Sequence, residues 1–166
     1  LVAQIIELEI PLILALNMTD LAASRGIAID VTRLSEQLGG IPVIETSGGR
    51  VEGVEALRTA IAGLAEGRHP SLHIPYSPEI ERELAVLSEA TAQRLPAEVA
   101  PQPRWLATKL LEDDPAVLDA LSEADRRALL DAARAVRKRI EAETGEDTET
   151  LIADQRYQFI GMVTAQ

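Results

Sequence analysis

Two short apolar runs in the first part of the chain alternate with stretches of helical periodicity. The runs cover residues 11–16 and 41–46. Polar residues do not alternate along the first run, which predicts a parallel strand buried on both faces. Helices are predicted over residues 2–8, 20–25, 31–38 and 54–64. The order of strand, helix, strand and helix predicts a right-handed βαβ unit followed by one more helix.

Residues that start and stop helices support these boundaries. Asp30 stands where an N-cap is expected, and Gly39 follows the end of the same helix. Further along, Ser122 and Asp125 resemble a capping box, and Gly145 stands where the helix opened by that box should end. These signals predict a short helix from residue 31 and a long helix between residues 122 and 145.

Three prolines fall close together between residues 68 and 78, and they predict a linker there. No strand is predicted beyond it. Further helices are predicted over residues 79–95, 105–112 and 150–163, with another opening at Asp113-Asp114-Pro115. The predicted fold class is therefore α/β followed by all-α, with an α/β part in residues 1–67, a linker in 68–78 and a helical part in 79–166.

The predicted sheet contains only two strands, and an isolated pair of strands is not independently stable. The chain also begins at Leu1, inside a predicted helix. We therefore interpret the sequence as an N-terminally truncated fragment of a longer protein whose remaining strands lie upstream. The open edge of the sheet should be covered by another chain or by a rearranged helix, because unpaired strand edges attract pairing partners.

Composition and charge narrow the function. The chain has 16 basic and 27 acidic residues, a net charge of −11, and no Cys. An acidic surface repels phosphate backbones, so nucleic acid is not an expected partner. The lack of Cys excludes a thiolate metal site and fits a cytosolic location. Residues 1–18 are apolar but contain Glu7, Glu9 and Pro11, which a membrane span would not tolerate.

Two polar side chains follow the first apolar run, at Asn17 and Asp20. In open α/β sheets, ligands bind at the carboxyl ends of the strands. A carboxylate can accept hydrogen bonds from the ring N–H and the exocyclic amine of guanine, while an amide can meet the N7 and carbonyl edge. Guanine is the heterocycle that this pair suits, although Asn and Asp are also common turn formers.

Two other groups of residues consist of side chains that can bind metal ions. His69 and His73 have the spacing of paired ligands on a helix, but Pro70 argues against a helix there. Glu112-Asp113-Asp114 is better explained as charge at a helix N-terminus than as an iron site. No metal ligands are therefore predicted.

The helical part contains one basic stretch and the single Trp of the chain. We interpret the basic stretch as a solvated face; it comprises Arg134, Arg137, Lys138 and Arg139. Trp105 is expected to anchor the core of the helical part or to contact the other part of the chain.

The segment Asn17-Met18-Thr19-Asp20 resembles the fourth guanine-nucleotide motif of small GTPases, Asn-Lys-x-Asp, with Met18 in place of Lys. That replacement resembles the cytosolic G domain of the prokaryotic ferrous iron transport protein B family. Further stretches that resemble this family extend over nearly the whole chain, at residues 26–30, 34–39, 41–43, 53–57, 104–114 and 153–160. No single stretch is decisive, but their order and spacing together are specific.

The resemblance implies the C-terminal part of a Ras-like P-loop GTPase domain in residues 1–67 and a helical domain that slows nucleotide release in residues 79–166. GTP or GDP would be the cofactor, with guanine held by Asn17, Met18 and Asp20. Ser47-Gly48-Gly49 matches the fifth motif, usually Ser-Ala-x, whose backbone N–H groups meet the guanine carbonyl. The thioether of Met18 would fill the space over the base that the Lys stem usually takes.

The sequence departs from the GTPase pattern in several large respects. It contains no Gly-x-x-x-x-Gly-Lys-Ser/Thr, no switch regions and no Asp-x-x-Gly motif. The fragment alone is therefore not expected to hydrolyse GTP, no catalytic residue is predicted, and Mg²⁺ would belong to the complete G domain.

The resemblance also implies a parent protein that transports Fe(II). Its membrane-embedded domain would belong to the same polypeptide, and this part would lie on the cytoplasmic face of the bacterial inner membrane. A homo-oligomer is a possible assembly. Helices after Pro78 would pack against the G domain and bias its nucleotide-bound states, which requires differential contact with the two states.

Two rival hypotheses stay open. The first is a soluble GTPase of another family, and an apolar membrane region after Gln166 would argue against it. The second is a helical protein-interaction module with a vestigial α/β part, which upstream sequence without a phosphate loop would favour.

Overall fold

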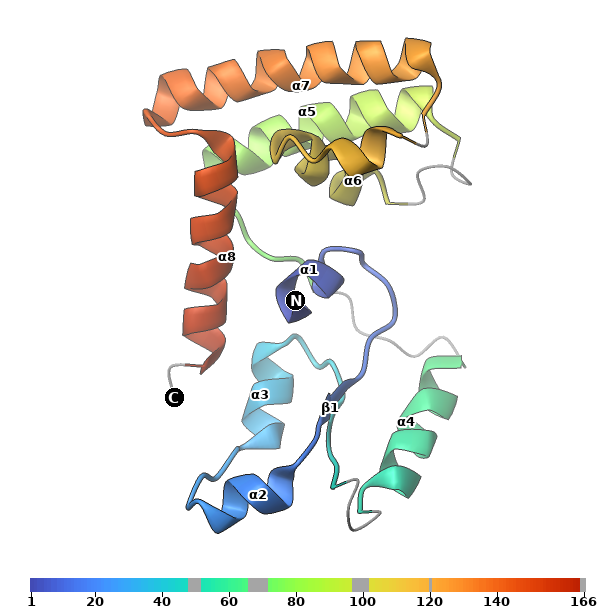
Figure 1. Ribbon diagram of the computed structural model, residues 1–166, viewed down its shortest axis with the longest axis vertical. Helices are drawn as coiled ribbons and strands as arrows, with labels where there is room; N and C mark the ends of the chain where they lie inside the picture. Colours follow the sequence, from blue (N-terminus) through green and yellow to red (C-terminus); the bar gives the residue numbers. More distant parts are fainter. Residues whose placement is uncertain (48–51, 66–71, 97–101, 120, 165–166) are drawn as a thin grey trace. The chain divides into compact units, whose positions relative to one another are not determined.

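The computed structural model describes residues 1–47, 52–65, 72–96, 102–119 and 121–164 (Figure 1). The chain divides into two compact units. Leu1–His73 and Gly161–Gln166 form unit 1, and Ile74–Ile160 form unit 2. The division at Ile74 falls within the predicted linker of residues 68–78.

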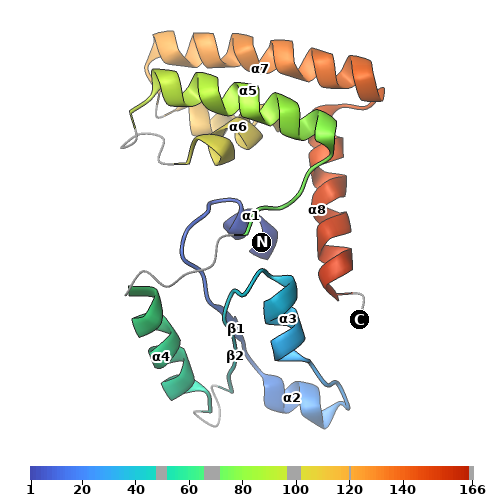
Figure 2. The ribbon, with the colours of Figure 1, turned by 180° about the vertical axis from the view of Figure 1, so that it is seen from behind.

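Unit 1 is built around two parallel strands with helices beside them. Its elements, in chain order, are α1 (Val2–Ile6), β1 (Leu14–Leu16), α2 (Thr19–Ser24), α3 (Val31–Gln37), β2 (Val43–Glu45) and α4 (Val54–Ala65). The strands pair in parallel, with Leu14 opposite Val43 and Leu16 opposite Glu45 (Figure 2). This confirms the predicted strand–helix–strand–helix order, although both strands are shorter than predicted.

Local chemistry explains where α3 lies. The side chain of Asp30 accepts a hydrogen bond from the backbone N–H of Arg33 at 2.9 Å, as expected of an N-cap. Leu38 and Ile41, which flank the turn after the helix, are both buried and bring the chain into β2. α3 therefore packs against β2, and the chain reverses direction between the two at Gly39 and Gly40, both with positive φ.

Two predictions of burial in unit 1 are wrong within the described residues. β1 is not covered on both faces, because Ala15 is exposed and Leu14 and Leu16 are only half-buried. The predicted inner face of α4 is also open, with Ile61 54% exposed. The physical reason is that the described sheet has two strands only, so β1 has one neighbouring strand. A rearranged helix does not bury this edge among the described residues, and cover by another chain stays a prediction.

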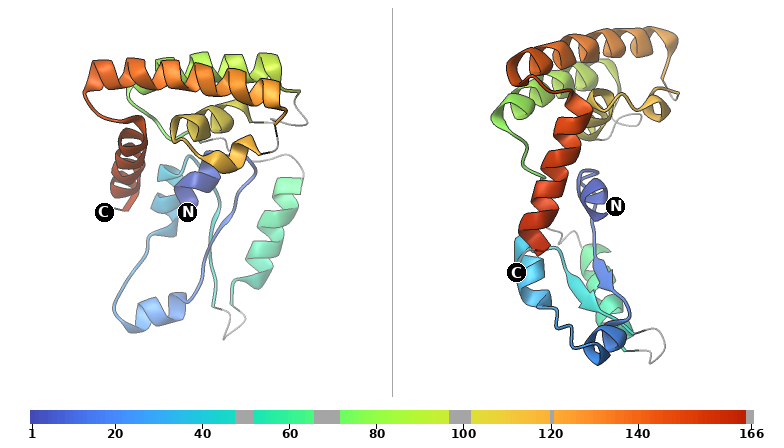
Figure 3. Two further views of the ribbon diagram at one scale, coloured as in Figure 1. Left: turned by 45° about the horizontal axis from the view of Figure 1, so that its top comes forward. Right: turned by 60° about the vertical axis from the view of Figure 1, so that its left-hand side comes forward.

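Unit 2 is helical, and no strand occurs in its described residues, as predicted. Its elements are α5 (Pro78–Arg94), α6 (Pro103–Leu111), the one-turn 3-10 helix η1 (Pro115–Leu118), α7 (Glu123–Thr144) and α8 (Thr148–Thr164), whose last turn belongs to unit 1. α5 and α7 run side by side and α6 packs against both (Figures 1 and 3). The fully buried side chains at their contacts include Ile80, Leu84, Leu87, Leu110, Leu111, Leu129 and Ile140.

The ends of α7 follow the predicted signals. The Ser122 hydroxyl accepts a hydrogen bond from the backbone N–H of Asp125 at 3.2 Å and donates one to its carboxylate at 2.6 Å. Gly145 adopts φ +78°, the left-handed conformation that ends many helices. The helix predicted to open at Asp113-Asp114-Pro115 is only η1, because four residues after Leu118 the Ser122 cap already starts α7.

Candidate guanine-binding edge

The carboxyl ends of β1 and β2 are tied together by Thr46. Its backbone N–H donates to the carbonyl oxygen of Leu16 at 2.8 Å, and its hydroxyl donates to the same oxygen at 3.2 Å. In return, its own carbonyl oxygen accepts hydrogen bonds from the backbone N–H of Thr19 at 3.4 Å and from the Thr19 hydroxyl at 3.2 Å. The segment after β1 and the segment after β2 are therefore one connected edge.

Asn17-Met18-Thr19-Asp20 forms a tight turn into α2 on this edge. Met18 is the N-cap residue and has φ +65°, a left-handed conformation that costs a non-glycine residue about 1 kcal/mol or more. The backbone N–H of Met18 donates to the Asn17 side-chain oxygen at 2.9 Å, which stabilises the turn. The Met18 side chain is 56% exposed, and Asp20 lies half-buried in the first turn of α2.

Ser47 begins the segment after β2 and is buried, at 1% exposure. It forms an isolated antiparallel bridge with Glu52, in which Ser47 N–H donates to the Glu52 carbonyl at 3.2 Å and Glu52 N–H donates back at 3.3 Å. Gly48 and Gly49, the other residues predicted for this segment, lie outside the described residues. The tertiary structure thus brings Asn17, Met18, Asp20 and Ser47 to the same edge of the sheet.

Thr46 was not among the residues predicted for the site, although it bonds the segments on both sides of the edge. Its hydroxyl lies 3.5 Å from the side-chain oxygen of Asn17 as well as bonding Leu16. A signal for it exists in the sequence, because a Thr at the end of a strand directly before the Ser47-Gly48-Gly49 segment can bond across to the neighbouring strand.

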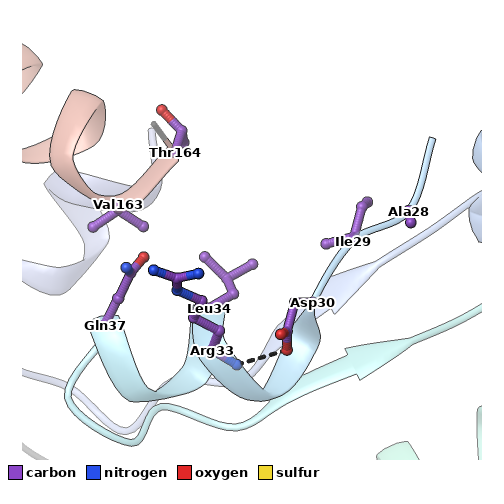
Figure 4. Close-up of a pocket in the computed structure, with 8 residues that line it drawn as sticks. All are labelled: Ala28, Ile29, Asp30, Arg33, Leu34, Gln37, Val163 and Thr164. Carbon is purple, nitrogen blue, oxygen red and sulfur yellow. Dashed lines mark hydrogen bonds between the residues drawn. The ribbon is translucent and has the colours of Figure 1, made fainter. Parts of the chain in front are cut away.

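Described residues of unit 1 line hollows of the surface in at least two places. Thr19 of the turn and Glu45 of β2 help to line one of them, together with residues between Ala22 and Ile29. The other has a volume of about 230 Å³ and lies over α3, from which Arg33, Leu34 and Gln37 point toward Val163 (Figure 4). Asn17, Met18, Asp20 and Ser47, the described residues among those predicted to hold guanine, do not line this second hollow.

The acidic cluster in unit 2 is a structural ion-pair network. Glu112 pairs with Lys109 at 2.9 Å and with Arg156 of α8, both nearly buried. Asp113 pairs with Arg137 at 2.9 Å, and Asp114 lies 3.6 Å from Lys109. These ion pairs join the end of α6 to α7 and α8, a role that the interpretation of the carboxylates as helix N-terminal charge did not include.

Burial alone would raise the pKa of Glu112, but hydrogen bonds from Arg156 and Lys109 outweigh it and the pKa lies below its ordinary value.

The interpretation of the basic stretch on α7 as a solvated face is only partly right. Arg137 is engaged with Asp113, and Arg139 bonds the buried carboxylate of Glu83 at 2.6 Å. The Arg139 hydrogen bond lowers the pKa of Glu83.

The metal-ligand alternatives find no support in the described residues. His69 lies outside them, and the ring of His73 lies 3.0 Å from the carboxylate of Glu9. Among the residues that the structure describes, no group of three or more His, Cys, Asp or Glu side chains could hold a metal ion.

Trp105, which was expected to anchor the core of the helical part or to contact the other part of the chain, is half-buried on α6 rather than fully enclosed.

Comparison with known proteins assigns both parts of the chain. Residues 76–166 match the family described as FeoB cytosolic helical domain, and residues 1–61 match the family described as Ferrous iron transport protein B. The chain belongs to the ferrous iron transport protein B family. Curated FeoB relatives include the Fe(2+) transporter FeoB of Salmonella choleraesuis, 37% identical over 163 residues, and that of Escherichia coli K12, 36% identical over 163 residues. The alignments cover 98% of this chain but 20% of each relative.

Solved FeoB structures share the fold. An S. thermophilus NFeoB mutant bound to GMPPNP superposes with a TM-score of 0.83 at 30% identity, covering 100% of this chain and 63% of that one. NFeoB from S. thermophilus bound to GDP, AlF4⁻ and K⁺ gives 0.82 at 30% identity, covering 100% of this chain and 63% of that one. The predicted fold class, the C-terminal part of a FeoB G domain followed by a helical domain, is confirmed. No helix in the described residues is long and apolar enough to cross a membrane.

Proposed function

We propose that this chain carries the guanine-recognition half of a FeoB G domain together with the helical domain that modulates nucleotide release. Asn17, Met18 and Asp20 hold the guanine base, and the segment Ser47-Gly48-Gly49 meets its carbonyl. The parent protein is a ferrous iron transporter, and its cytosolic region reports the bound nucleotide, GTP or GDP, to the membrane-embedded part of the same polypeptide.

The observation that carries this proposal is the connection between the two base-recognition segments. Thr46 bonds Leu16 and Thr19 at once, so the turn that holds Asn17 and Asp20 is fixed relative to the segment that begins at Ser47. Flat heterocycles are recognised by a few polar groups in a fixed arrangement. A pair of unconnected turns would not provide that arrangement.

Each contact has a distinct chemical task. A carboxylate at Asp20 suits the ring N–H and the exocyclic amine of guanine, which adenine does not offer in the same places. The left-handed conformation of Met18 sets Asn17 and Asp20 on either side of one tight turn. The exposed thioether of Met18 is available to lie against the face of the base.

The parent chain supplies what these residues do not. FeoB relatives are about five times as long as the aligned region, and solved NFeoB proteins bind GDP and GMPPNP. The phosphate-binding loop and Mg²⁺ belong to the rest of the G domain, Fe(II) is the transported cargo, and the region lies on the cytoplasmic face of the bacterial inner membrane. Assembly into homo-oligomers is part of the same proposal.

The deciding experiment measures nucleotide binding by the full-length chain from the same gene. GDP, ADP and xanthosine diphosphate are compared in wild type and Asp20→Asn. Xanthine carries a carbonyl where guanine carries the amine, so an amide at position 20 suits it better than a carboxylate. Wild type should prefer GDP, and Asp20→Asn should shift the preference to the xanthine nucleotide. Binding of none of the three, or no effect of Asp20→Asn, would favour the interaction-module hypothesis.

A further inference from the structure

The chain passes between the two units twice. It leaves unit 1 after His73 and returns to it at Gly161, so unit 2 has two covalent connections to unit 1. A body held by one flexible strand can turn freely, whereas a body held at two points turns about the line that joins them. This restriction applies only if neither connection is slack, so the contacts at each end of the two connections decide what movement is available.

The unit 1 side of the first connection is held by contacts of Leu72 and His73. The Leu72 side chain lies over Gly39, in the turn between α3 and β2, where a Cβ would be 3.2 Å from Leu72 Cδ1. The ring of His73 lies 3.0 Å from the carboxylate of Glu9. All four residues belong to unit 1. The connection is therefore tied to unit 1 up to its last residue there.

The unit 2 side of the same connection is held by a buried tyrosine. Ile74 and Tyr76 are buried, and the backbone N–H of Tyr76 donates to the Glu81 carboxylate at 3.1 Å. Arg104 donates two hydrogen bonds to that carboxylate, both at 2.8 Å, and its guanidinium lies 6.0 Å from the centroid of the Tyr76 ring. Bidentate bonds of this kind fix orientation as well as distance. Since Ile74 follows His73 directly, the first connection has little slack.

The second connection runs through the continuous helix α8. Before the crossing, Arg156 and Phe159 are buried, and Arg156 pairs with Glu112 of unit 2. After the crossing, Val163 lies over α3 of unit 1, at the hollow shown in Figure 4. A straight helix placed across both units would resist any change of angle between them unless it had a weak point.

The first residue of α8 after the crossing is a glycine. A Cβ on Gly161 would meet nothing within 4 Å, and its φ does not lie in the left-handed region, so neither packing nor backbone geometry requires glycine there. It is the only glycine of α8, which contains no proline. Glycine favours the helical conformation up to about fivefold less than alanine, because it loses more backbone freedom. α8 therefore bends most easily where it passes between the units.

On the unit 2 side, the two connections are bonded to each other. The backbone N–H of Ser77 donates to the side-chain oxygen of Gln155 on α8 at 2.7 Å. Ser77 directly follows the held Tyr76, and Gln155 precedes Gly161 on the same helix. Unit 2 therefore holds both connections as one base, and bending at Gly161 is the movement that this base leaves available.

We propose that the two connections form a hinge, with Gly161 as its pivot in α8 and the hold of Glu81 and Arg104 on Tyr76 as its fixed side. Unit 2 reorients as one body about this hinge rather than on a flexible tether. The hinge follows from the chain's own contacts and does not require nucleotide, so it goes beyond the proposed function.

The test measures distance distributions between pairs of spin labels by pulsed electron paramagnetic resonance, on the full-length protein from the same gene. Non-canonical amino acids carry the labels at exposed positions. The pair at Glu36 and Glu141 spans the hinge, and the pair at Glu141 and Gln158 lies within unit 2. In wild type the distribution across the hinge should be broader than the one within unit 2. Equal widths would overturn the proposal.

Gly161→Ala should narrow the distribution across the hinge. Alanine favours the unbent helix, so the ratio of bent to unbent conformers should fall by about threefold to fivefold. Gly63→Ala adds the same methyl group inside α4, also with nothing within 4 Å, and should leave the distribution unchanged. If Gly161→Ala did not narrow it, or if both variants narrowed it equally, Gly161 would not be the pivot.

Arg104→Gln should broaden the same distribution, because it removes the bidentate hold on the carboxylate that binds the Tyr76 N–H. Arg127→Gln, which breaks an exposed pair with Glu123 on α7, is the control and should change nothing. The distribution within unit 2 should keep its wild-type width in every variant, which separates a freed hinge from an unfolded unit.

The outcomes distinguish a hinge from a tether. A broad wild-type distribution that neither Gly161→Ala nor Arg104→Gln alters would identify a flexible tether and overturn the proposal. Opposite changes in these two variants, with both controls unchanged, would support the hinge. Because no nucleotide enters these measurements, a failure of guanine recognition would leave them as they are.

Discussion

Thr46 and Leu16 are joined by two hydrogen bonds at the carboxyl ends of neighbouring parallel strands. The backbone N–H of Thr46 and its hydroxyl both donate to the Leu16 carbonyl oxygen, at 2.8 Å and 3.2 Å. The backbone bond would form with any residue except proline, but the second bond requires a hydroxyl. This pair fixes the segment after β1 to the segment after β2, and the candidate guanine site lies across it.

Replacement of Thr46 by Val should weaken guanine-nucleotide binding without unfolding the protein. Val keeps the shape but removes the hydroxyl that bonds Leu16 and lies 3.5 Å from the Asn17 side-chain oxygen. Loss of one such hydrogen bond costs about 1 kcal/mol, which corresponds to about fivefold in affinity. Fluorescence titration of the full-length chain with labelled GDP measures it. Thr59→Val, which removes an exposed hydroxyl on α4, is the control and should bind as wild type does.

Glu112→Gln should destabilise the helical unit by about 2 kcal/mol at pH 7, because Arg156 and Lys109 would lose the charge of the Glu112 carboxylate in a nearly buried site. Urea unfolding followed by circular dichroism measures the loss. The exposed Glu141→Gln on α7 serves as the control and should change stability by less than about 0.5 kcal/mol. An equal effect of both variants would contradict the buried network.

The stability difference between wild type and Glu112→Gln should depend on pH. The pKa of Glu112 is lowered in the folded protein, where hydrogen bonds from Arg156 and Lys109 outweigh burial. A carboxyl group with a lowered folded-state pKa stabilises the fold above its unfolded-state pKa of about 4.3, and this contribution is lost as pH falls through the folded-state value. The difference should therefore be constant from pH 7 to about pH 5 and shrink in more acidic solution. A difference that grows on acidification would refute this assignment.

Arg139→Met should cost more stability than the double variant Glu83→Leu/Arg139→Met. The single change leaves the Glu83 carboxylate, 8% exposed, with only the more distant Arg82 at 3.6 Å. An uncompensated charge in such a place costs about 1–3 kcal/mol, whereas replacing both partners by apolar groups is often neutral. Chemical denaturation of the three proteins supplies the comparison. A double variant less stable than the single one would show that the ion pair itself stabilises the contact between α5 and α7.

Gly145→Ala should lower the stability of the helical unit by about 1 kcal/mol, because φ +78° at the end of α7 is strained for any residue with a Cβ. Gly63→Ala, inside α4 with open space around it, should leave thermal stability unchanged or raise it. Differential scanning calorimetry of the two variants tests the prediction. If both shifted the melting temperature in the same direction, the cap would not be responsible.

Element boundaries were largely predictable from the sequence, for reasons that are local. Asp30 caps α3, Ser122 caps α7 and Gly145 ends α7, and each acts within four residues of its own position. The strands were predicted too long because apolar character continues beyond the residues that pair. The helix after Asp113-Asp114-Pro115 was overestimated because the next cap, at Ser122, competes for the same residues.

Burial was predicted less well than helix position. The apolar side of α4 and both faces of β1 read as core positions, yet Ile61 and Ala15 are exposed in the described structure. The hydrophobic pattern indicates which residues favour burial. Whether those residues are in fact buried depends on which other segments pack against them. The described sheet has only two strands, so these positions are left partly open.

The sequence by itself determined the helix and strand positions and the choice of Asn17 and Asp20 as candidate base ligands, because these depend on residues close together in the chain. It also determined the family resemblance, because that depends on the order and spacing of short motifs along the chain. Only the tertiary structure decided that Thr46 joins the two segments of the candidate site, that a Cβ at Gly53 would overlap the carbonyl oxygen of Glu45, and that Glu112 pairs with Arg156. Each of these relationships joins residues between 8 and 44 positions apart, which no local pattern reports. The physical reason is that hydrogen bonds, close backbone contacts and ion pairs depend on distance in space, which packing alone sets.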